Sequence, residues 1–278
     1  MNSSQQQPPD GHSTPMEEAA IARFGASLGR LSEELDWERL GKTYCWEGGE
    51  QFFSLGDRER LMDAGLAIAT DLAAHLARLP DSGSARSLYV GVGLAEQVPL
   101  ALEAIVLGRV VVARSLDGEE VRELARAATL VAGVVEGSLG PGRSLPVIEG
   151  RALGEEPPEG PFDHLWFVSL ISDPEAFPAL HDKLYGRDKR DAAPEQSDFA
   201  TGRGSLAEDK RHAEELVELA LAGVTPPAIL TTTDEELPFF ERALARRGWT
   251  LAMSKSARLS PIVGDPIRHG YIESADGA

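Results

Sequence analysis

A tight glycine-containing turn is the part of this sequence best suited to bind a ligand. The apolar residues 88–90 run directly into the stretch Gly91-Val92-Gly93-Leu94-Ala95-Glu96, and a helical pattern follows. Glycine lets the backbone turn sharply from strand to helix and lets a ligand approach it closely, while free amides at the helix start donate hydrogen bonds. Glycines also mark turns that bind nothing, so the wider pattern has to be considered.

The spacing after the second glycine separates two classes of ligand. The dinucleotide fingerprint Gly-x-Gly-x-x-Gly needs a small third residue for close helix–strand packing, and that position holds Glu96. This bulky acidic side chain counts against NAD, FAD and a nicotinamide-dependent oxidoreductase. The segment instead resembles the Gly-x-Gly-x-Gly turn of class I S-adenosylmethionine-dependent methyltransferases, with Ala95 as the third small residue. The resemblance continues in the order of elements over roughly residues 57 to 272, and it implies a Rossmann-like fold and S-adenosylmethionine as cofactor.

Several of the acidic cofactor contacts that the resemblance implies are absent or displaced. Tyr89 stands two positions before the first glycine, where the family has an acid. The carboxylate that would hold the ribose falls near Ser115; Asp117 lies two residues later and also fits the N-cap of the next helix. Ser138 stands where an aspartate often holds the adenine amine. The candidate cofactor-binding residues are Tyr89, Gly91, Gly93, Ala95, Ser115, Asp117 and Ser138.

Three polar residues beyond the predicted fourth strand are candidates for catalysis. Open α/β sheets bind ligands at the carboxyl ends of their strands, which places Asp173, His181 and Tyr185 near a reacting group. Asp173 or His181 would act as a general base, and Tyr185 lies one helical turn after His181. The run Asp173-Pro174-Glu175 is also a typical helix start. Methyl transfer needs mainly in-line positioning, so a base is not obligatory.

Two functional hypotheses follow from these residues. One is methyl transfer to a small molecule or a protein side chain. The other is a methyltransferase-like protein that no longer catalyses and serves as a binding or assembly partner, since serine or tyrosine occupies the acidic positions.

Other kinds of site find no support in the spacing. Neither a Ser-His-Asp set, a glycosidase-like pair nor a metal-ligand pattern can be assembled. Gly202-Arg203-Gly204-Ser205 has no strand before it and no Lys-Ser/Thr after it, so we interpret it as a linker and helix cap, not a P-loop. The single cysteine, Cys45, cannot form an intramolecular disulfide, which fits the reducing cytoplasm. No apolar run reaches the roughly 18 residues of a membrane helix.

The charge balance limits the partners. The chain has 45 acidic and 27 basic residues, a formal net charge of -18, so its surface repels phosphate backbones and anionic lipids. We therefore expect a small-molecule or protein substrate and neither nucleic acid nor a membrane as partner. A homodimer or another protein partner would use the N-terminal helices or the loop after Gly186.

The elements that must position these residues form three parts. Residues 1–15 are rich in Gln, Ser and Pro and are predicted to be disordered. Residues 16–83 contain two predicted amphipathic helices, the second over 57–79. An aromatic stretch joins them, and it either covers a pocket or docks the helices; its residues are Tyr44, Trp46, Phe52 and Phe53.

Residues 84–278 alternate short apolar runs with helical patterns, which predicts an α/β domain with a parallel-rich sheet between helices. The predicted strands are 87–92, 110–113, 132–136, 164–171, 228–232, 249–253 and a last one at 267–272. The predicted helices are 97–107, 118–128, 175–185, 206–221 and 235–247. Two long loops interrupt the pattern, 140–161 with one short strand near Val147, and 186–204; each is a surface insertion or an active-site lid.

Overall fold

The computed structural model describes nine stretches of the chain. They are residues 15–34, 55–80, 85–93, 95–115, 147–150, 153, 159–174, 176–186 and 205–275. The chain begins with two helices, α1 (Pro15–Glu34) and α4 (Leu55–Leu76), close to the two that the periodicity predicts. The aromatic stretch between them lies outside the described residues, as does the tail before Pro15.

One sheet forms the centre of the molecule. Its strands are β1 (Arg86–Val90), β2 (Val110–Ser115), β3 (Val147–Gly150), β4 (Phe162–Phe167), β5 (Val224–Thr233), β6 (Trp249–Met253), β7 (Arg258–Leu259) and β8 (Pro266–Ser274). Their order is β3-β2-β1-β4-β5-β8-β6, and β7 pairs with β8. The strands β1 to β5 pair in parallel, whereas β8 runs antiparallel to β5, β6 and β7. The predicted α/β class with a parallel-rich sheet is confirmed.

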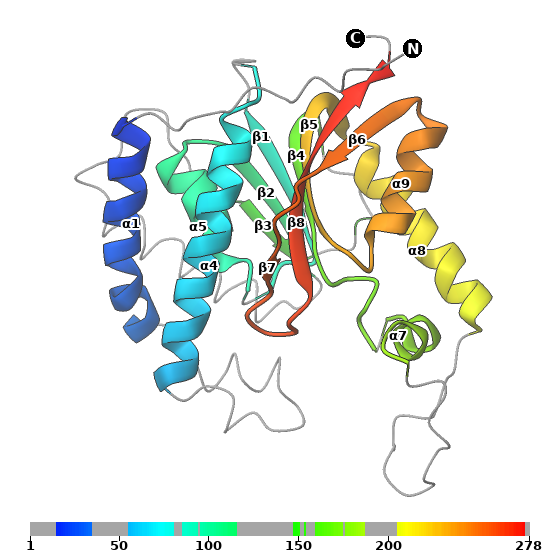
Figure 1. The fold of residues 1–278 in the computed structure, drawn as a ribbon, viewed down its shortest axis with the longest axis horizontal. Coiled ribbons are helices and arrows are strands. Elements are labelled where there is room, and N and C mark those ends of the chain that lie inside the picture. The colour runs from blue at the N-terminus through cyan, green and yellow to red at the C-terminus, as the bar shows by residue number, and fades with distance from the viewer. Residues whose placement is uncertain are drawn as a thin grey trace, which may run out of the picture.

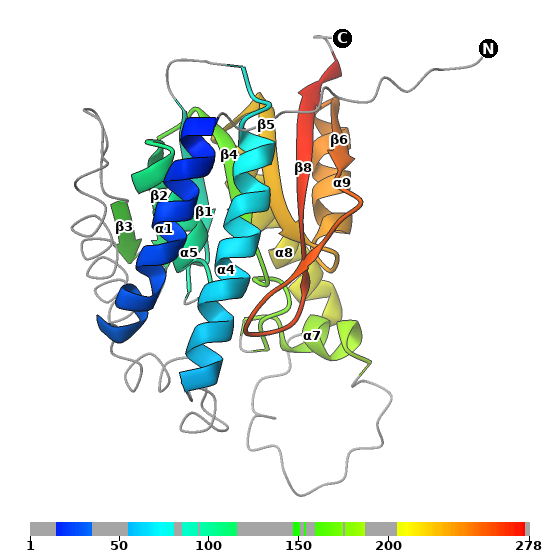
Figure 2. The ribbon, with the colours of Figure 1, turned by 60° about the vertical axis from the view of Figure 1, so that its left-hand side comes forward.

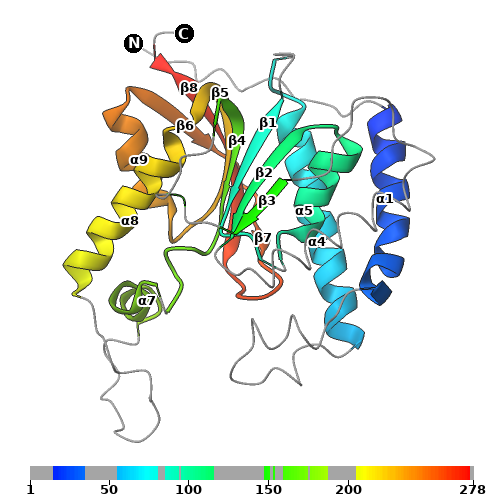
Figure 3. The same cartoon turned by 180° about the vertical axis from the view of Figure 1, so that it is seen from behind.

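Helices cover both faces of this sheet. After β1 come α5 (Gln97–Ala101) and a π-helical turn, η1 (Leu102–Val106), which together fill most of the predicted helix 97–107. The later helices are α7 (Pro178–Leu184), α8 (Leu206–Leu221) and α9 (Leu237–Arg246). Figures 1 and 2 show α1, α4 and α5 on one side of the sheet, and Figure 3 shows α8 and α9 from the other side.

Alternate side chains of each central strand enter two separate cores. In β4, Trp166 joins the core beneath α1, α4 and α5, whereas Leu165 and Phe167 join the core beneath α7, α8 and α9. Tyr89 and Leu88 of β1 divide in the same way. Because both faces are buried, such strands appear in a sequence as short continuous apolar runs, which explains why they could be located.

Local signals account for the elements whose bounds were predicted most closely. Helix α8 starts where expected because Ser205 and Glu208 form a capping box, with Glu208 N donating to Ser205 Oγ at 3.2 Å. This confirms Ser205 as a helix cap. Strand β6 covers the predicted 249–253, between the left-handed Gly248 and the loop that leads to β7.

Several strands differ from the prediction; β5, for example, begins at Val224, four residues before its predicted start. Strand β4 ends at Phe167, not at residue 171, because Ser169 takes a left-handed conformation with φ of 58° that breaks the extended run. The strand next to β2 is Val147–Gly150, the short strand expected inside the 140–161 loop. The predicted strand 132–136, the predicted helix 118–128 and most of the 186–204 loop lie outside the described residues.

The described stretches contain neither a candidate membrane span nor a candidate metal cluster. Within them, no helix combines the length and apolar character that crossing a bilayer requires. The same stretches contain no group of three or more His, Cys, Asp or Glu side chains arranged to hold a metal ion.

Candidate functional site

The Gly91 turn leaves the carboxyl end of β1 and passes between two neighbouring segments. Gly91 has φ of 70°, a left-handed conformation that favours glycine. The amides of Gly91 and Val92 both donate to the Arg114 carbonyl, at 3.0 and 3.1 Å, which ties the turn to the end of β2. A side chain at Gly91 would collide with Leu170, in the loop after β4. The turn therefore depends on glycine for both its conformation and its packing.

A buried carboxylate lies within this turn. Glu96 Oε2 accepts a hydrogen bond from Gly93 N at 2.9 Å, and Glu96 is only 6% exposed. Burial raises the pKa of Glu96 to about 7, against the opposing effect of the Gly93 amide and its own amide. The next residue, Gln97, is 3% exposed, and its side-chain oxygen and nitrogen find no hydrogen-bond partner in the described part of the protein. Both polar groups follow the turn directly.

Tyr89 lies in the core beneath α5. Its ring stacks on Trp166, with centroids 5.1 Å apart and planes 10° apart, and its hydroxyl donates to Glu103 Oε1. Burial and the Glu103 carboxylate raise the pKa of Tyr89 well above its ordinary value. Tyr89 therefore serves the packing under α5, and it is fully buried there.

The other predicted cofactor residues are only partly placed by the structure. Gly93 and Ala95 lie with Gly91 in the turn, and both are buried. Ser115 is the last residue of β2, in register with Gly150 of β3, at the same edge of the sheet as the turn. Asp117 and Ser138 lie outside the described residues.

A second carboxylate fixes the loop after β4. Glu236 Oε1 accepts hydrogen bonds from the amides of Leu170 and Ile171, at 2.6 and 3.1 Å. Its Oε2 accepts from the hydroxyls of Thr232 and Thr233. Glu236 is fully buried, and burial raises its pKa to about 7 although these donors oppose the rise. The end of β5 thus fixes the loop that faces the Gly91 turn.

Asp265 accepts hydrogen bonds from three hydroxyl groups at the edge of the sheet where the parallel strands end. It lies just before β8, is 3% exposed, and accepts hydrogen bonds from Ser169 Oγ at 2.9 Å and Ser172 Oγ at 3.3 Å. Its Oδ1 accepts the Tyr185 hydroxyl at 2.8 Å. Burial and the hydrogen bond to Asp265 raise the pKa of Tyr185. Asp265 therefore connects α7 to the loop after β4.

The predicted pair His181 and Tyr185 is brought to this cluster. Their ring centroids lie 4.7 Å apart. His181 Nδ1 lies 2.6 Å from the Ser172 carbonyl oxygen, and because a carbonyl only accepts, Nδ1 carries the proton. In neutral His181 the lone pair is then on Nε2, which is buried and has no hydrogen-bond partner in the described ranges. This arrangement suits a general base.

Asp173 lies at the start of the turn that leads into α7. Its Oδ1 accepts a hydrogen bond from Ala176 N at 2.7 Å, and its carbonyl accepts from Phe177 N at 2.9 Å. Both bonds satisfy amides ahead of α7. Asp173 therefore stabilises the turn ahead of α7, which itself starts at Pro178 with Phe177 as its N-cap.

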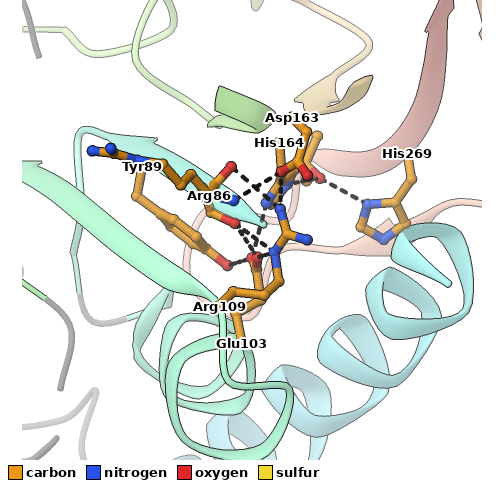
Figure 4. Close-up of polar contacts among 9 residues, drawn as sticks. Arg86, Tyr89, Glu103, Arg109, Asp163, His164 and His269 are labelled. Carbon is orange, nitrogen blue, oxygen red and sulfur yellow. Dashed lines mark hydrogen bonds and ion pairs between the residues drawn. The ribbon is translucent and has the colours of Figure 1, made fainter. Parts of the chain in front are cut away.

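Figure 4 shows a second polar network, which is buried and centres on Glu103. Glu103, on η1, accepts hydrogen bonds from Ser87 and Tyr89 and forms an ion pair with Arg109 Nε at 2.9 Å. His164 Nδ1 lies 2.9 Å from Glu103 Oε1. Arg109 also forms an ion pair with Asp163. The network spans β1, β4 and the helix between β1 and β2.

The network continues across the sheet through a hydroxyl group. Thr231 Oγ1, on β5, lies 3.0 Å from His164 Nε2 and 2.9 Å from His269 Nδ1, on β8. Burial alone would raise the pKa of Glu103, but His164, Arg109 and Ser87 overcome it and lower that pKa to about 2. Burial lowers the pKa of His269 to about 3. Glu103 is therefore ionised and His269 neutral near pH 7.

Sequence reasoning missed Glu96 as a polar group, and it missed Asp265, Glu236 and Glu103 altogether. Glu96 was noted only as too large for a dinucleotide turn. Asp265 lies in a Pro- and Gly-containing loop, and Glu103 lies in a predicted helix, where a single acid ordinarily faces solvent. A lone acid among apolar residues of a helix, as in Leu102-Glu103-Ala104-Ile105-Val106, is the one signal that could have identified a buried carboxylate.

The strand order distinguishes this sheet from a dinucleotide-binding sheet. Doubly wound dinucleotide-binding sheets follow the order 3-2-1-4-5-6, whereas here the reversed last strand, β8, is inserted between β5 and β6. A reversed final strand is what the resemblance at the glycine turn implied. The chain has a class I methyltransferase-like fold. In this methyltransferase-like fold, the chain adds β2 and β3 on one side of β1 and then β4 and β5 on the other side. The Gly91 turn lies at the point where this direction reverses, between β1 and β4.

Comparisons with known proteins give structural likeness alone. No protein-family model matches the sequence, and no curated protein matches it. One similar solved structure is a SAM-dependent O-methyltransferase from Thermotoga maritima, with 11% identity, a TM-score of 0.42, and coverage of 75% of this chain and 65% of that one. TrmN from Thermus thermophilus gives 20% identity, a TM-score of 0.40, and coverage of 73% and 48%.

A third solved structure matches over most of both chains. Magnesium protoporphyrin IX methyltransferase from Synechocystis PCC 6803, solved with bound SAH, is 10% identical, with a TM-score of 0.49 and coverage of 92% of this chain and 99% of that one. The chain thus spans about two thirds of the length of the Thermotoga protein and about half of the length of TrmN. It spans almost all of the Synechocystis enzyme.

Proposed function

We propose that this protein transfers a methyl group from S-adenosylmethionine to an acceptor. The observation that carries the proposal is the position of the Gly91 turn, at the carboxyl end of β1 and beside β4, where the sheet connections change direction. Open α/β sheets bind their ligands at this switch point. The sulfonium of S-adenosylmethionine supplies an electrophilic methyl group.

The polar groups around the turn fit such a cofactor. Within the turn, Gly93 N donates to the Glu96 carboxylate, and the buried Gln97 amide has no hydrogen-bond partner among the described residues. We propose that Gly91, Gly93 and Ala95 form the close backbone approach to the cofactor. Tyr89 supports the turn from beneath α5, and roles for Ser115, Asp117 and Ser138 stay predictions.

The acceptor side of the site is proposed to lie at the Asp265 cluster. We propose that His181 Nε2, which has no hydrogen-bond partner in the described residues, takes a proton from an acceptor hydroxyl or amine while the methyl group is transferred. Asp265, through Tyr185 and Ser172, holds α7 and the loop after β4 in place. Methyl transfer needs in-line placement of the acceptor, so this rigidity serves the reaction directly.

We infer that the acceptor is a small molecule or a protein side chain. The formal net charge of -18 supports this choice, because an acidic surface repels phosphate backbones. A cytoplasmic location and a homodimer or protein partner are also proposed from the sequence.

Calorimetry with S-adenosylmethionine and S-adenosylhomocysteine tests the proposal. We expect binding by the wild-type protein and none by Gly93→Arg, because the arginine side chain would fill the turn. Circular dichroism must show that the variant is folded. A folded wild-type protein that binds neither ligand at millimolar concentration would overturn the proposal.

Labelled methyl transfer into a lysate of the source organism tests catalysis separately. Label incorporated in the presence of the wild-type protein, above that with Gly93→Arg, supports a methyltransferase. Cofactor binding without any transfer would favour the non-catalytic binding partner.

A further inference from the structure

The imidazole of His181 contacts two residues that share one hydrogen-bond partner, Asp265. His181 Nδ1 lies 2.6 Å from the carbonyl oxygen of Ser172, and the ring centroids of His181 and Tyr185 lie 4.7 Å apart. Ser172 Oγ donates to Asp265 Oδ2 at 3.3 Å, and the Tyr185 hydroxyl donates to Asp265 Oδ1 at 2.8 Å. The two carboxylate oxygens of Asp265 are therefore linked to His181 by two routes, one through the loop after β4 and one through the end of α7.

The loop that carries the Ser172 carbonyl contains a backbone conformation that needs support. Ser169 has φ of 58°, which is uncommon for a residue other than glycine. Its hydroxyl donates to Asp265 Oδ2 at 2.9 Å, and its carbonyl accepts from Ser172 Oγ at 3.2 Å. A strained residue persists where its surroundings hold it, and such residues cluster at functional sites. Asp265 and Ser172 hold Ser169 in this way, and they thereby fix the loop beside His181.

Asp265 is itself fixed by the hairpin between β7 and β8. Ser260 N donates to the Asp265 carbonyl at 2.8 Å, and Gly264 N donates to the Ser260 carbonyl at 3.0 Å. The two strands pair next to this loop, with Leu259 opposite Pro266. The carboxylate of Asp265 is thus an acceptor whose backbone is held independently of α7 and of the loop after β4.

The Ser172 carbonyl decides which nitrogen of His181 can accept a proton. The tautomer of a neutral histidine is set by the hydrogen bond that its other ring nitrogen makes. With the proton on Nδ1, the lone pair is on Nε2, which has no hydrogen-bond partner among the described residues. If the carbonyl moved away, the proton could reside on Nε2 instead, and Nε2 could no longer accept one. The use of His181 as a base therefore depends on the position of one carbonyl oxygen.

We infer that Asp265 is a positioning residue for His181, which keeps the proton on Nδ1 and the lone pair on Nε2 by holding the Ser172 carbonyl and the Tyr185 ring in place. This inference rests on the proposed function, because His181 is the base named there. It goes beyond the rigidity of the site, because it assigns the choice of one tautomer to one carboxylate on the hairpin before β8.

NMR of the imidazole nitrogens tests this inference without a methyl acceptor. Long-range proton–nitrogen correlation spectra at pH 8 distinguish a protonated ring nitrogen from one with a lone pair, and the spectrum of His181→Asn identifies the His181 signals. We expect wild-type His181 to carry its proton on Nδ1. Asp265→Asn keeps one acceptor oxygen and Asp265→Leu keeps neither, so we expect the fraction with the proton on Nε2 to grow in that order.

The rate of labelled methyl transfer at saturating S-adenosylmethionine is the second measurement. Because a small misplacement of a reacting group costs up to about 10²-fold in rate, we expect a loss of about tenfold in Asp265→Asn and up to about 10²-fold in Asp265→Leu. The affinity for S-adenosylhomocysteine should stay within about twofold. Asp234→Asn is the matched control, since its carboxylate pairs with Arg268 of β8 and is 41% exposed, and it should change neither the tautomer nor the rate.

The outcomes separate this inference from the proposed function. A wild-type protein that transfers no methyl group overturns the proposed function, and the NMR comparison then still decides whether Asp265 sets the tautomer. The inference itself is overturned if wild-type His181 carries its proton on Nε2, if the proton stays on Nδ1 in both Asp265 variants, or if the tautomer changes while the rate does not. Should Asp265→Leu fail to fold, Asp265→Asn and Ser169→Gly decide by the same comparison, because glycine accepts the left-handed backbone but lacks the hydroxyl.

Discussion

His164 Nδ1 lies 2.9 Å from Glu103 Oε1, and both side chains are completely shielded from solvent. Glu103 also accepts hydrogen bonds from Arg109 Nε, Ser87 Oγ and the Tyr89 hydroxyl. One carboxylate on the π-helical turn therefore contacts side chains from β1, from β4 and from the residue just before β2.

Removing this carboxylate should destabilise the protein strongly. Glu103→Gln would leave Arg109 without its buried counter-charge, and breaking a buried pair costs about 3 to 5 kcal/mol. Urea denaturation at pH 7.5 measures the change in the free energy of unfolding. The control is Glu215→Gln in the exposed Arg211–Glu215 pair, for which a loss within about 0.5 kcal/mol is expected. Similar losses in the two variants would show that the network adds no net stability.

The Gly91 turn can be tested with a pair of glycines that share a conformation. Gly91 and Gly248 have φ of 70° and 69°, but only Gly91 lacks room for a Cβ. Gly248→Ala should cost about 1 to 2 kcal/mol through its backbone alone, with cofactor affinity retained. Gly91→Ala should cost about 1 to 3 kcal/mol more, because its methyl group meets Leu170, and should abolish S-adenosylhomocysteine binding.

Thermal denaturation and calorimetry on the two alanine variants give both quantities. If the two variants lose the same free energy of unfolding and bind S-adenosylhomocysteine equally well, the contact between the turn and Leu170 contributes to neither stability nor binding.

Glu236 should make stability fall as pH rises. Its folded pKa of about 7 exceeds the ordinary value of 4.5, so the folded chain keeps a proton that the unfolded chain releases between these values. The stabilisation is present at acidic pH and is lost as pH rises through 7. Between pH 5.5 and 8, wild type should lose about 2 kcal/mol relative to Glu236→Gln. Urea denaturation at both pH values measures this; parallel pH curves for the two proteins would contradict it.

His181→Asn should slow methyl transfer without weakening cofactor binding. Asparagine keeps a donor for the Ser172 carbonyl but removes the Nε2 lone pair, and loss of a general base costs about 10² to 10⁴ in rate. The rate of labelled methyl transfer at saturating S-adenosylmethionine, followed from pH 6 to 9, tests this. The affinity for S-adenosylhomocysteine should stay unchanged. The rate of methyl transfer by Tyr185→Phe, which keeps the ring beside His181, serves as the comparison. A rate near that of wild type would remove His181 from the mechanism.

The sequence by itself determined the elements whose signals are local. Helix α8 starts at Leu206 because Ser205 caps it, and β6 runs from Trp249 to Met253 as a strand that follows Gly248 directly. The Gly91 turn could be found because glycine is required by its left-handed backbone. The alternation of such elements was sufficient to predict a parallel-rich sheet between helices.

Tertiary structure alone decided which polar groups meet. Asp265 and Ser169 are 96 residues apart and Tyr185 and Asp265 are 80 apart, yet each pair is hydrogen-bonded. Tyr89, predicted to face a cofactor, turns to Glu103, and the Glu96 carboxylate lies at the turn instead. Periodicity reports how much of each residue is buried, but it carries no information about which distant strand lies beside it. The partners of a buried carboxylate are set by the order of strands in the sheet, and only the folded chain contains that order.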